Sequence, residues 1–265
     1  MSLPTPAAAR ASAEQVPVRV FGGPTALIEY GGLRILTDPT FDAPGDYSRP
    51  GRPTLTKTAP ASVAPADLGP VDAVLLSHDE HADNLDHSGR AFLADVPVTL
   101  TTPSGAPRLG GTAQGLAPWE SVELRRPDGG TVTVTGAPAL HGPDGVEGVE
   151  EVTGEVIGFV LTSADLPTVY VSGDNASLIM VERIAERFGP VDTAVLFAGA
   201  PRFPVLFDGA PIVLDSAGAA EAARILGARR VVPAHCDSWA HFTEGREDLV
   251  AAFTAAGLAD RLQLG

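Results

Sequence analysis

The sequence contains a single cysteine, Cys236, so the chain cannot form an internal disulfide, and a reducing compartment is expected. It lacks any apolar stretch long enough to span a bilayer. Residues 1–15 are Ala-rich and polar, without the continuous apolar core of a secretory signal. We therefore expect a cytoplasmic protein that does not enter the membrane, with a disordered N-terminal segment at residues 1–15.

Basic side chains are also scarce. The chain carries 18 Lys and Arg against 33 Asp and Glu, a net charge of −15, and no segment concentrates Lys or Arg. Such a field repels phosphate backbones, so nucleic acid is a poor candidate partner. It favours metal cations, although an acidic surface is also a common route to solubility. We expect a small-molecule substrate as the partner, and the sequence leaves the oligomeric state open.

Several familiar catalytic motifs are missing. There is no Gly-x-Ser-x-Gly nucleophile elbow and no Gly-x-x-x-x-Gly-Lys phosphate loop. With one cysteine there is no chelating Cys pair, which excludes a structural zinc finger. Cys236 itself is better explained as a small buried side chain than as a reactive thiol.

The length and composition suit a globular enzyme. With 265 residues and 44% apolar residues, we expect one domain over residues 16–265. Short β-like runs at residues 16–21, 25–30 and 33–37, separated by Gly-Gly turns, predict an antiparallel meander. The Pro-rich residues 39–70 are expected to form a functional loop or to carry short elements. Each half of the chain runs from β-rich to helical, which predicts an α/β fold with two sheets face to face and helices outside.

Potential metal ligands follow four of the predicted strands. His78 and His81 come after the buried run at residues 71–76, in the segment SHDEHADNLD, which holds six titratable side chains in ten residues. Further candidates come after the strands at residues 131–135, 168–172 and 230–233, namely His141, Asp174 and His235. Because loops at one end of a sheet are where a scaffold places reactive groups, we expect these side chains to meet.

Imidazole and carboxylate together suit Zn²⁺, and also Fe or Mn. Such a metal polarises a substrate oxygen and lowers the pKa of bound water towards ~7, which supplies hydroxide at neutral pH. Each residue alone has an ordinary explanation: a single histidine is more often hydrogen-bonded than metal-bound, and Asp174 in SGDN suits a turn. The joint occurrence of these residues favours a metal centre, and His87 is expected to be solvated.

These segments resemble the metallo-β-lactamase superfamily, and within it the branch of ascorbate-6-phosphate lactonase-like hydrolases. The resemblance covers residues 21–265 and is carried by the segments LTDP with Asp38, SHDEHADNLD, His141, VSGD with Asp174, and PAH with His235. It implies a four-layer αβ/βα sandwich of two mixed sheets, with one or two metal ions at the end of the sheets.

The resemblance also implies roles for individual residues. His78 is similar to the first histidine of the family's His-x-His-x-Asp-His motif, and His141 to the isolated histidine of the first metal site. Asp174 corresponds to the carboxylate that bridges two metals, and His235 to the last ligand of the second site. Asp38 lies where the family has an aspartate that supports the ligands.

The motif departs from the family pattern, and two alignments stay open. With Glu80 as a one-residue insertion, the motif gives His78, His81 and Asp83, and Asn84 replaces a histidine of the second metal. Without a gap, Glu80 takes the second ligand position, as in diiron oxidoreductases of the superfamily, but Ala82 then stands where a carboxylate is needed. We favour the first.

The sequence thus predicts a metal-dependent hydrolase, with zinc as the expected metal in one or two ions and Mn²⁺ or Fe as alternatives. His78, His81 and His141 would hold one ion, and Asp83, Asp174 and His235 would complete a second or mixed site. Metal-bound hydroxide would attack an ester, lactone or phosphoester. Asp83 is expected to orient or deprotonate the water, and His241 to contact or protonate the leaving group. A diiron-type oxidoreductase and a non-catalytic metal-binding protein of the same fold are the alternatives.

Overall fold

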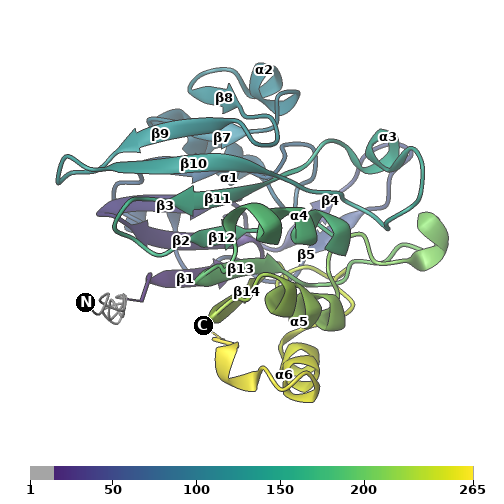
Figure 1. Ribbon diagram of the computed structural model, residues 1–265. Coiled ribbons are helices and arrows are strands. Elements are labelled where there is room, and N and C mark those ends of the chain that lie inside the picture. The colour runs from purple at the N-terminus through teal and green to yellow at the C-terminus, as the bar shows by residue number, and fades with distance from the viewer. Residues whose placement is uncertain (1–14, 265) are drawn as a thin grey trace, which may run out of the picture.

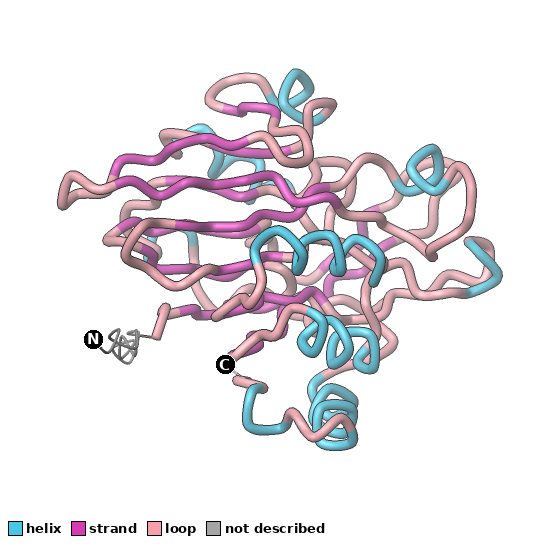
Figure 2. Tube along the Cα trace, in the orientation of Figure 1, coloured by secondary structure: helices cyan, strands magenta, loops and turns pink. Residues whose placement is uncertain are grey.

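Two six-stranded β-sheets lie face to face, and helices cover their outer faces (Figure 1, Figure 2). The computed structural model describes residues 15–264. The segment predicted to be disordered, residues 1–15, lies outside this range except for Gln15. The predicted α/β fold, a four-layer αβ/βα sandwich of two mixed sheets with outer helices, is confirmed.

The first sheet begins with the predicted antiparallel meander and continues with parallel strands. Its order is β1-β2-β3-β6-β7-β8, and pairing is parallel from β3 onward. Gly23-Pro24 and Gly31-Gly32 form the two turns of the meander, and Gly23, Gly31 and Gly32 have the positive φ that glycine tolerates best. The strands are β1 (Val18–Gly22), β2 (Thr25–Tyr30), β3 (Leu33–Thr37), β6 (Ala73–Leu75), β7 (Thr99–Thr101) and β8 (Ala113–Gly115).

The second sheet has the order β14-β13-β12-β11-β10-β9, antiparallel from β9 to β12 and parallel from β12 to β14. Its strands are β9 (Ser121–Arg125), β10 (Thr131–Pro138), β11 (Ile157–Thr162), β12 (Val169–Val171), β13 (Thr193–Phe197) and β14 (Arg230–Ala234). A separate two-stranded hairpin is formed by β4 (Gly45–Tyr47) and β5 (Leu55–Lys57). The Pro-rich residues 39–70 therefore do carry short elements.

Three helices cover the second sheet, and one lies against the first (Figure 1). These are α4 (Leu178–Phe188), α5 (Ser216–Ile225) and α6 (Arg246–Ala255) on the second sheet, and α1 (His87–Phe92) on the first. The short elements are α2 (Gly105–Leu109), α3 (Val149–Thr153), η1 (Pro65–Asp67), η2 (Leu93–Asp95), η3 (Phe207–Gly209) and η4 (Ala259–Arg261). Within residues 15–264, no helix has the length and apolar character that crossing a bilayer requires.

Alternation along the strands divides the apolar side chains between a central core and two outer ones. In β6, Leu75 packs into the core between the sheets, whereas Val74 packs outward. In β11, Phe159 lies in the same central core, whereas Val160 packs against the residues of α4 and α5. Because successive side chains of a strand point to opposite faces, each strand stabilises two layers at once.

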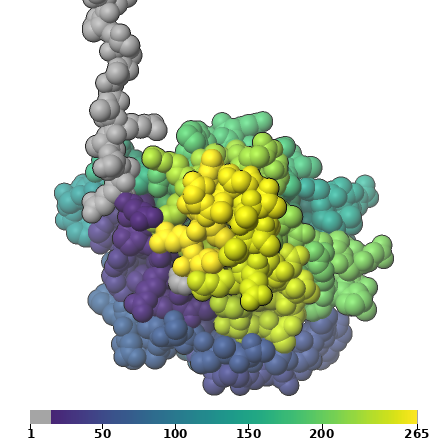
Figure 3. All heavy atoms as spheres, turned by 90° about the horizontal axis from the view of Figure 1, so that it is seen from below, coloured from purple at the N-terminus to yellow at the C-terminus, as the bar shows by residue number. Residues whose placement is uncertain are grey.

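The two ends of the described chain meet at one edge of the sandwich, where Figure 3 shows the purple N-terminal strand beside the yellow C-terminal residues. Gln15 Nε2 donates to Gln263 Oε1 at 3.1 Å, and the buried guanidinium of Arg230 donates to Val16 O at 2.6 Å. β1 and β14 are edge strands of different sheets, so these contacts hold the two sheets together at that edge.

A buried ion pair fixes the hairpin against the segment that follows β6. Lys57, the only lysine of the chain, is 2% exposed, and its Nζ lies 2.8 Å from Asp86 Oδ2. Asp86 is also the N-cap of α1, where its Oδ1 accepts from Gly89 N at 2.8 Å. The ring of Trp239 lies 5.6 Å from the Lys57 ammonium. One carboxylate therefore orders the hairpin, the start of α1 and the segment between β6 and α1.

Lys57→Met leaves the buried carboxylate of Asp86 without its counter-charge, and we expect it to lower the free energy of unfolding by about 3–5 kcal/mol. Urea denaturation followed by circular dichroism measures the loss. Arg229→Met is the matched control, because the Arg229 side chain is exposed and its pair with Asp192, with 3.8 Å between Nη1 and Oδ2, should contribute less than about 1 kcal/mol. Equal losses in the two variants would contradict a special role for the buried pair.

Candidate metal centre

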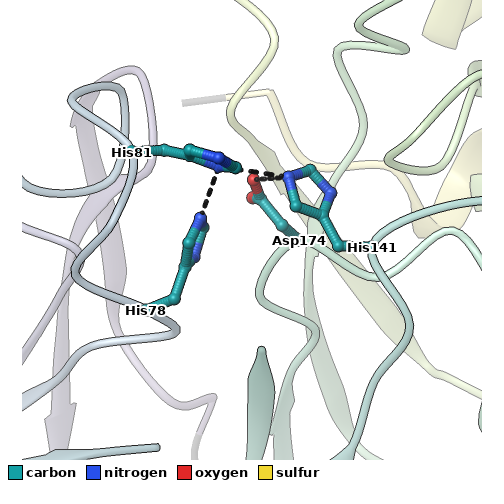
Figure 4. A group of neighbouring side chains, drawn as sticks. All are labelled: His78, His81, His141 and Asp174. Atoms are coloured by element: carbon teal, nitrogen blue, oxygen red, sulfur yellow. Dashed lines mark hydrogen bonds and ion pairs between the residues drawn. The ribbon is translucent and has the colours of Figure 1, made fainter. Parts of the chain in front are cut away.

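Four side chains from both sheets converge where strands β6, β10 and β12 end (Figure 4). His78 Nε2 lies 2.8 Å from His81 Nδ1, which in turn lies 3.3 Å from His141 Nε2. The same His141 nitrogen lies 3.5 Å from Asp174 Oδ2. His78, His141 and Asp174 are buried, and His81 is partly exposed. Three imidazoles and one carboxylate thus point at a common centre.

The spacing of these atoms fits a small tetrahedral metal ion. With Zn–N bonds of about 2.0–2.1 Å, neighbouring ligand atoms of a tetrahedral site lie about 3.3–3.4 Å apart. The separations of 2.8, 3.3 and 3.5 Å between successive atoms bracket that value, and all four atoms lie within 4.8 Å of one another. His141 Nδ1 donates to Ile212 O at 2.7 Å, which leaves the lone pair of Nε2 directed at the cluster. The residues present therefore fit such an ion.

Electrostatics keeps two of the histidines neutral, the form that binds metal. Burial and the neighbouring His81 hold the pKa of His78 well below its ordinary value. Burial, with a contribution from His141, lowers the pKa of His81 to about 4, and the positive charge of Arg52 acts in the same direction. At neutral pH both rings can therefore offer a lone pair without first losing a proton.

A second group shares Asp174 with the first and adds Asp83 and His235. His235 Nε2 lies 3.3 Å from Asp83 Oδ2, and His235 Nδ1 lies 3.6 Å from Asp174 Oδ1. Among the described residues, neither ring nitrogen of His235 has a hydrogen-bond partner, and Asp83 Oδ1 has none. A buried polar atom without a partner costs about 1–3 kcal/mol, so this donor set also suits a bound cation.

Charge within the second group is complementary. Burial opposes ionisation of Asp83, but His241 and His235 hold its pKa well below the ordinary value. Burial likewise disfavours the charged form of His235, but Asp174 and Asp83 raise its pKa. Asp83 is therefore an ionised acceptor at neutral pH.

The two residues that decide the alignment of the first motif occupy different places. Asn84 is buried, and its Nδ2 donates to Asp174 Oδ1 at 3.0 Å and to Ser77 Oγ at 3.3 Å. Glu80 belongs to neither group, and its Oε2 lies 3.4 Å from Arg108 Nη2. The fold thus brings His81, and not Glu80, to the other histidines.

Asp38 supports the first histidine through Ser77, as the resemblance implies. Its Oδ1 accepts from Ser77 N at 2.9 Å and from Ser77 Oγ at 2.6 Å, and Ser77 Oγ lies 3.0 Å from His78 Nδ1. Burial raises the pKa of Asp38 to about 8. These hydrogen bonds from Asp38 through Ser77 fix the orientation of the His78 ring.

A pocket opens onto both groups, and His241 forms part of its wall. His241 Nε2 lies 2.9 Å from Asp83 Oδ2, and the ring of Phe203 stacks on the His241 ring at 5.7 Å. The lining residues are Tyr47, Arg49, Arg52, Pro53, Leu55, Glu80, His81, Ala82, Asp83, His141, Val152, Thr153, Gly154, Pro201, Phe203, Leu206, Ile212 and His241. The sequence analysis did not identify Arg49 and Arg52 as pocket residues. The Pro-Gly pair between them predicts a tight turn, which would have placed the two arginines close together.

The chain is similar to several known proteins. The model of the beta-lactamase superfamily domain matches residues 33–236. A UPF0173 metal-dependent hydrolase of Methanosphaerula palustris is 32% identical over 172 residues, which cover 63% of this chain and 69% of that protein. Another, from Pyrobaculum neutrophilum, is 29% identical over 91% of this chain and 93% of its own.

The fold has solved counterparts. An isothiocyanate hydrolase from Delia radicum gut bacteria superposes with a TM-score of 0.76 at 22% identity, over 93% of this chain and 95% of that one. The narrower resemblance to ascorbate-6-phosphate lactonase-like hydrolases stays a prediction. The matched domain, the relatives and the two groups of side chains that could hold a metal agree, and the chain belongs to the metal-dependent hydrolases of the metallo-β-lactamase superfamily.

Proposed function

We propose that the protein is a zinc hydrolase that cleaves an ester, lactone or phosphoester in a small molecule. The observation that carries the proposal is the convergence of three imidazoles and the Asp174 carboxylate beside a pocket that His81 and His141 line. Nitrogen and oxygen donors at tetrahedral spacing favour zinc over magnesium or calcium, which prefer oxygen donors and higher coordination numbers.

The two groups of side chains would hold up to two ions. His78, His81, His141 and Asp174 form the first set, and Asp83, Asp174 and His235 the second. When bound, zinc polarises a substrate oxygen and lowers the pKa of water. Asn84 donates a hydrogen bond to the shared carboxylate, and it stands where the family has a histidine. We therefore propose that the second set binds its ion more weakly than the first.

Asp83 and His241 are the proposed proton-transfer pair. Asp83 is ionised and lines the pocket, so it can orient the attacking water and take its proton. The 2.9 Å contact between Asp83 Oδ2 and His241 Nε2 offers a path for that proton to the imidazole. His241 forms part of the pocket wall and would deliver the proton to the leaving oxygen. The pair thus combines a general base with a general acid.

Loss of a ligand should weaken metal binding more than loss of a supporting group. Asp38→Asn disturbs only the orientation of His78, and we expect about 10–100-fold weaker zinc binding. His141→Ala removes one imidazole of the first set, and its loss of affinity should exceed that range. Competition with a chromophoric chelator measures both affinities. His87→Ala is the control, because His87 is exposed and lies outside both groups; a loss of zinc affinity there equal to that of His141→Ala would contradict the proposed ligand set.

His241→Gln removes the proposed acid, and we expect kcat to fall about 10²–10⁴-fold with zinc content unchanged. The assay uses the zinc-loaded protein with aryl esters, lactones and bis-aryl phosphates, and His87→Gln serves as the matched histidine control. Stoichiometric zinc without turnover on any of these classes would identify a non-catalytic metal-binding protein. Tightly bound iron with a redox signal would instead support the diiron oxidoreductase alternative.

A further inference from the structure

The turn between β4 and β5 places two arginines side by side at the pocket. Its sequence is Arg49-Pro50-Gly51-Arg52, and Arg52 N donates to Arg49 O at 3.1 Å. Proline suits the second position of a type II turn, and Gly51, with φ of 74°, supplies the left-handed third position. The first and fourth Cα atoms of such a turn lie within about 7 Å of each other. The local sequence therefore makes the two arginines neighbours.

Both guanidinium groups are anchored but keep their charge unpaired. Arg49 Nη1 donates to Glu80 O, and Arg52 Nη1 donates to Val152 O. Within residues 15–264, neither forms an ion pair with a carboxylate. Seven other arginines of this range do so: Arg34, Arg90, Arg108, Arg126, Arg202, Arg224 and Arg229. Since a guanidinium has five N–H donors, each of the pair keeps donors for a ligand.

The rest of the pocket does not neutralise this charge. Its two acidic side chains already have partners, because Glu80 faces Arg108 and Asp83 faces His235 and His241. Much of the remaining wall is apolar, with Leu55, Val152, Pro201, Phe203, Leu206 and Ile212. One pocket thus combines an apolar wall, the metal-ligating groups and a pair of arginines in a chain of net charge −15.

We propose that Arg49 and Arg52 form an anion-binding subsite, and that the ligand of this pocket is an amphipathic molecule with an apolar body and a carboxylate. The apolar body would lie against the apolar wall, with the carboxylate at the arginine pair. A monoanion suits the site better than a dianion, because the carboxylates of Glu80 and Asp83, although each has a partner, still bring negative charge to the same pocket. The binding of this ligand is independent of the proposed function, but its role as a substrate rests on that function.

Isothermal titration of the zinc-loaded full chain tests the subsite without any turnover. The probes are 4-phenylbutanoate and its neutral analogue 4-phenylbutanamide, which differ in charge but hardly in shape. We expect the carboxylate to bind at least about tenfold more tightly, since charge-assisted hydrogen bonds are the stronger ones. The preference should disappear in R49Q/R52Q, shrink with added salt and persist in the control Arg229→Gln.

A preference for the carboxylate that survives in R49Q/R52Q would overturn the proposal, because the metal centre would then hold the anion. Failure of both probes to bind, or tighter binding of 4-phenylbutyl phosphate than of the carboxylate, would overturn it too. R49K/R52K keeps the positive charges but loses the planar guanidinium groups. A preference for the carboxylate probe that lies between the preferences of the wild type and R49Q/R52Q would support the proposal. Circular dichroism checks that each variant is folded. An arginine-dependent preference in a protein that hydrolyses no ester would support the subsite and count against the proposed function alone.

Discussion

The carboxylate of Asp174 contacts both halves of the centre, and the geometry of the site depends on it. Its Oδ2 lies 3.5 Å from His141 Nε2, while its Oδ1 lies 3.6 Å from His235 Nδ1 and accepts from Asn84 at 3.0 Å. Asp174 follows a strand of the second sheet, whereas Asn84 follows a strand of the first. One buried carboxylate therefore links the sheets across the sandwich. Its burial is tolerated because the Asn84 amide donates to it and the imidazoles of His141 and His235 lie beside it.

A second layer of buried polar contacts holds the segments that approach this carboxylate. Asp86 pairs with Lys57 of the hairpin and caps α1. It therefore holds the hairpin against the segment between β6 and α1, and both contribute residues to the pocket wall. The hairpin in turn carries the Arg49–Arg52 turn, whose guanidinium groups reach the segment after β6 and the end of α3. The pocket is thus assembled from loops, but each loop is tied to a buried charge or to a strand end.

The sequence predicted the structure well where a regular strand pattern was followed by a clear turn or by a polar residue at the strand end. The meander was predictable because Gly-Gly turns separate alternating runs, and β2 and β3 match the predicted residues 25–30 and 33–37. The gathering of His78, His141, Asp174 and His235 followed from strands that end at one edge. The hairpin within residues 39–70 was not predictable, since its three-residue strands are too short for a period to show.

The choice between Glu80 and His81 needed the fold, because a shift of one residue in an irregular loop changes which side chain points inward. In the structure Glu80 faces Arg108, and His81 completes the imidazole cluster. Asn84 donates an amide N–H to the shared carboxylate of Asp174. An amide NH₂ group has no lone pair to offer a metal ion, unlike the imidazole of a histidine. The oxygen that accepts this hydrogen bond, Asp174 Oδ1, is the one that lies 3.6 Å from His235 Nδ1, so the amide of Asn84 and the second group share one carboxylate oxygen. The two halves of the centre therefore differ in their donors: the first combines three imidazoles with one carboxylate, and the second combines one imidazole with two carboxylates.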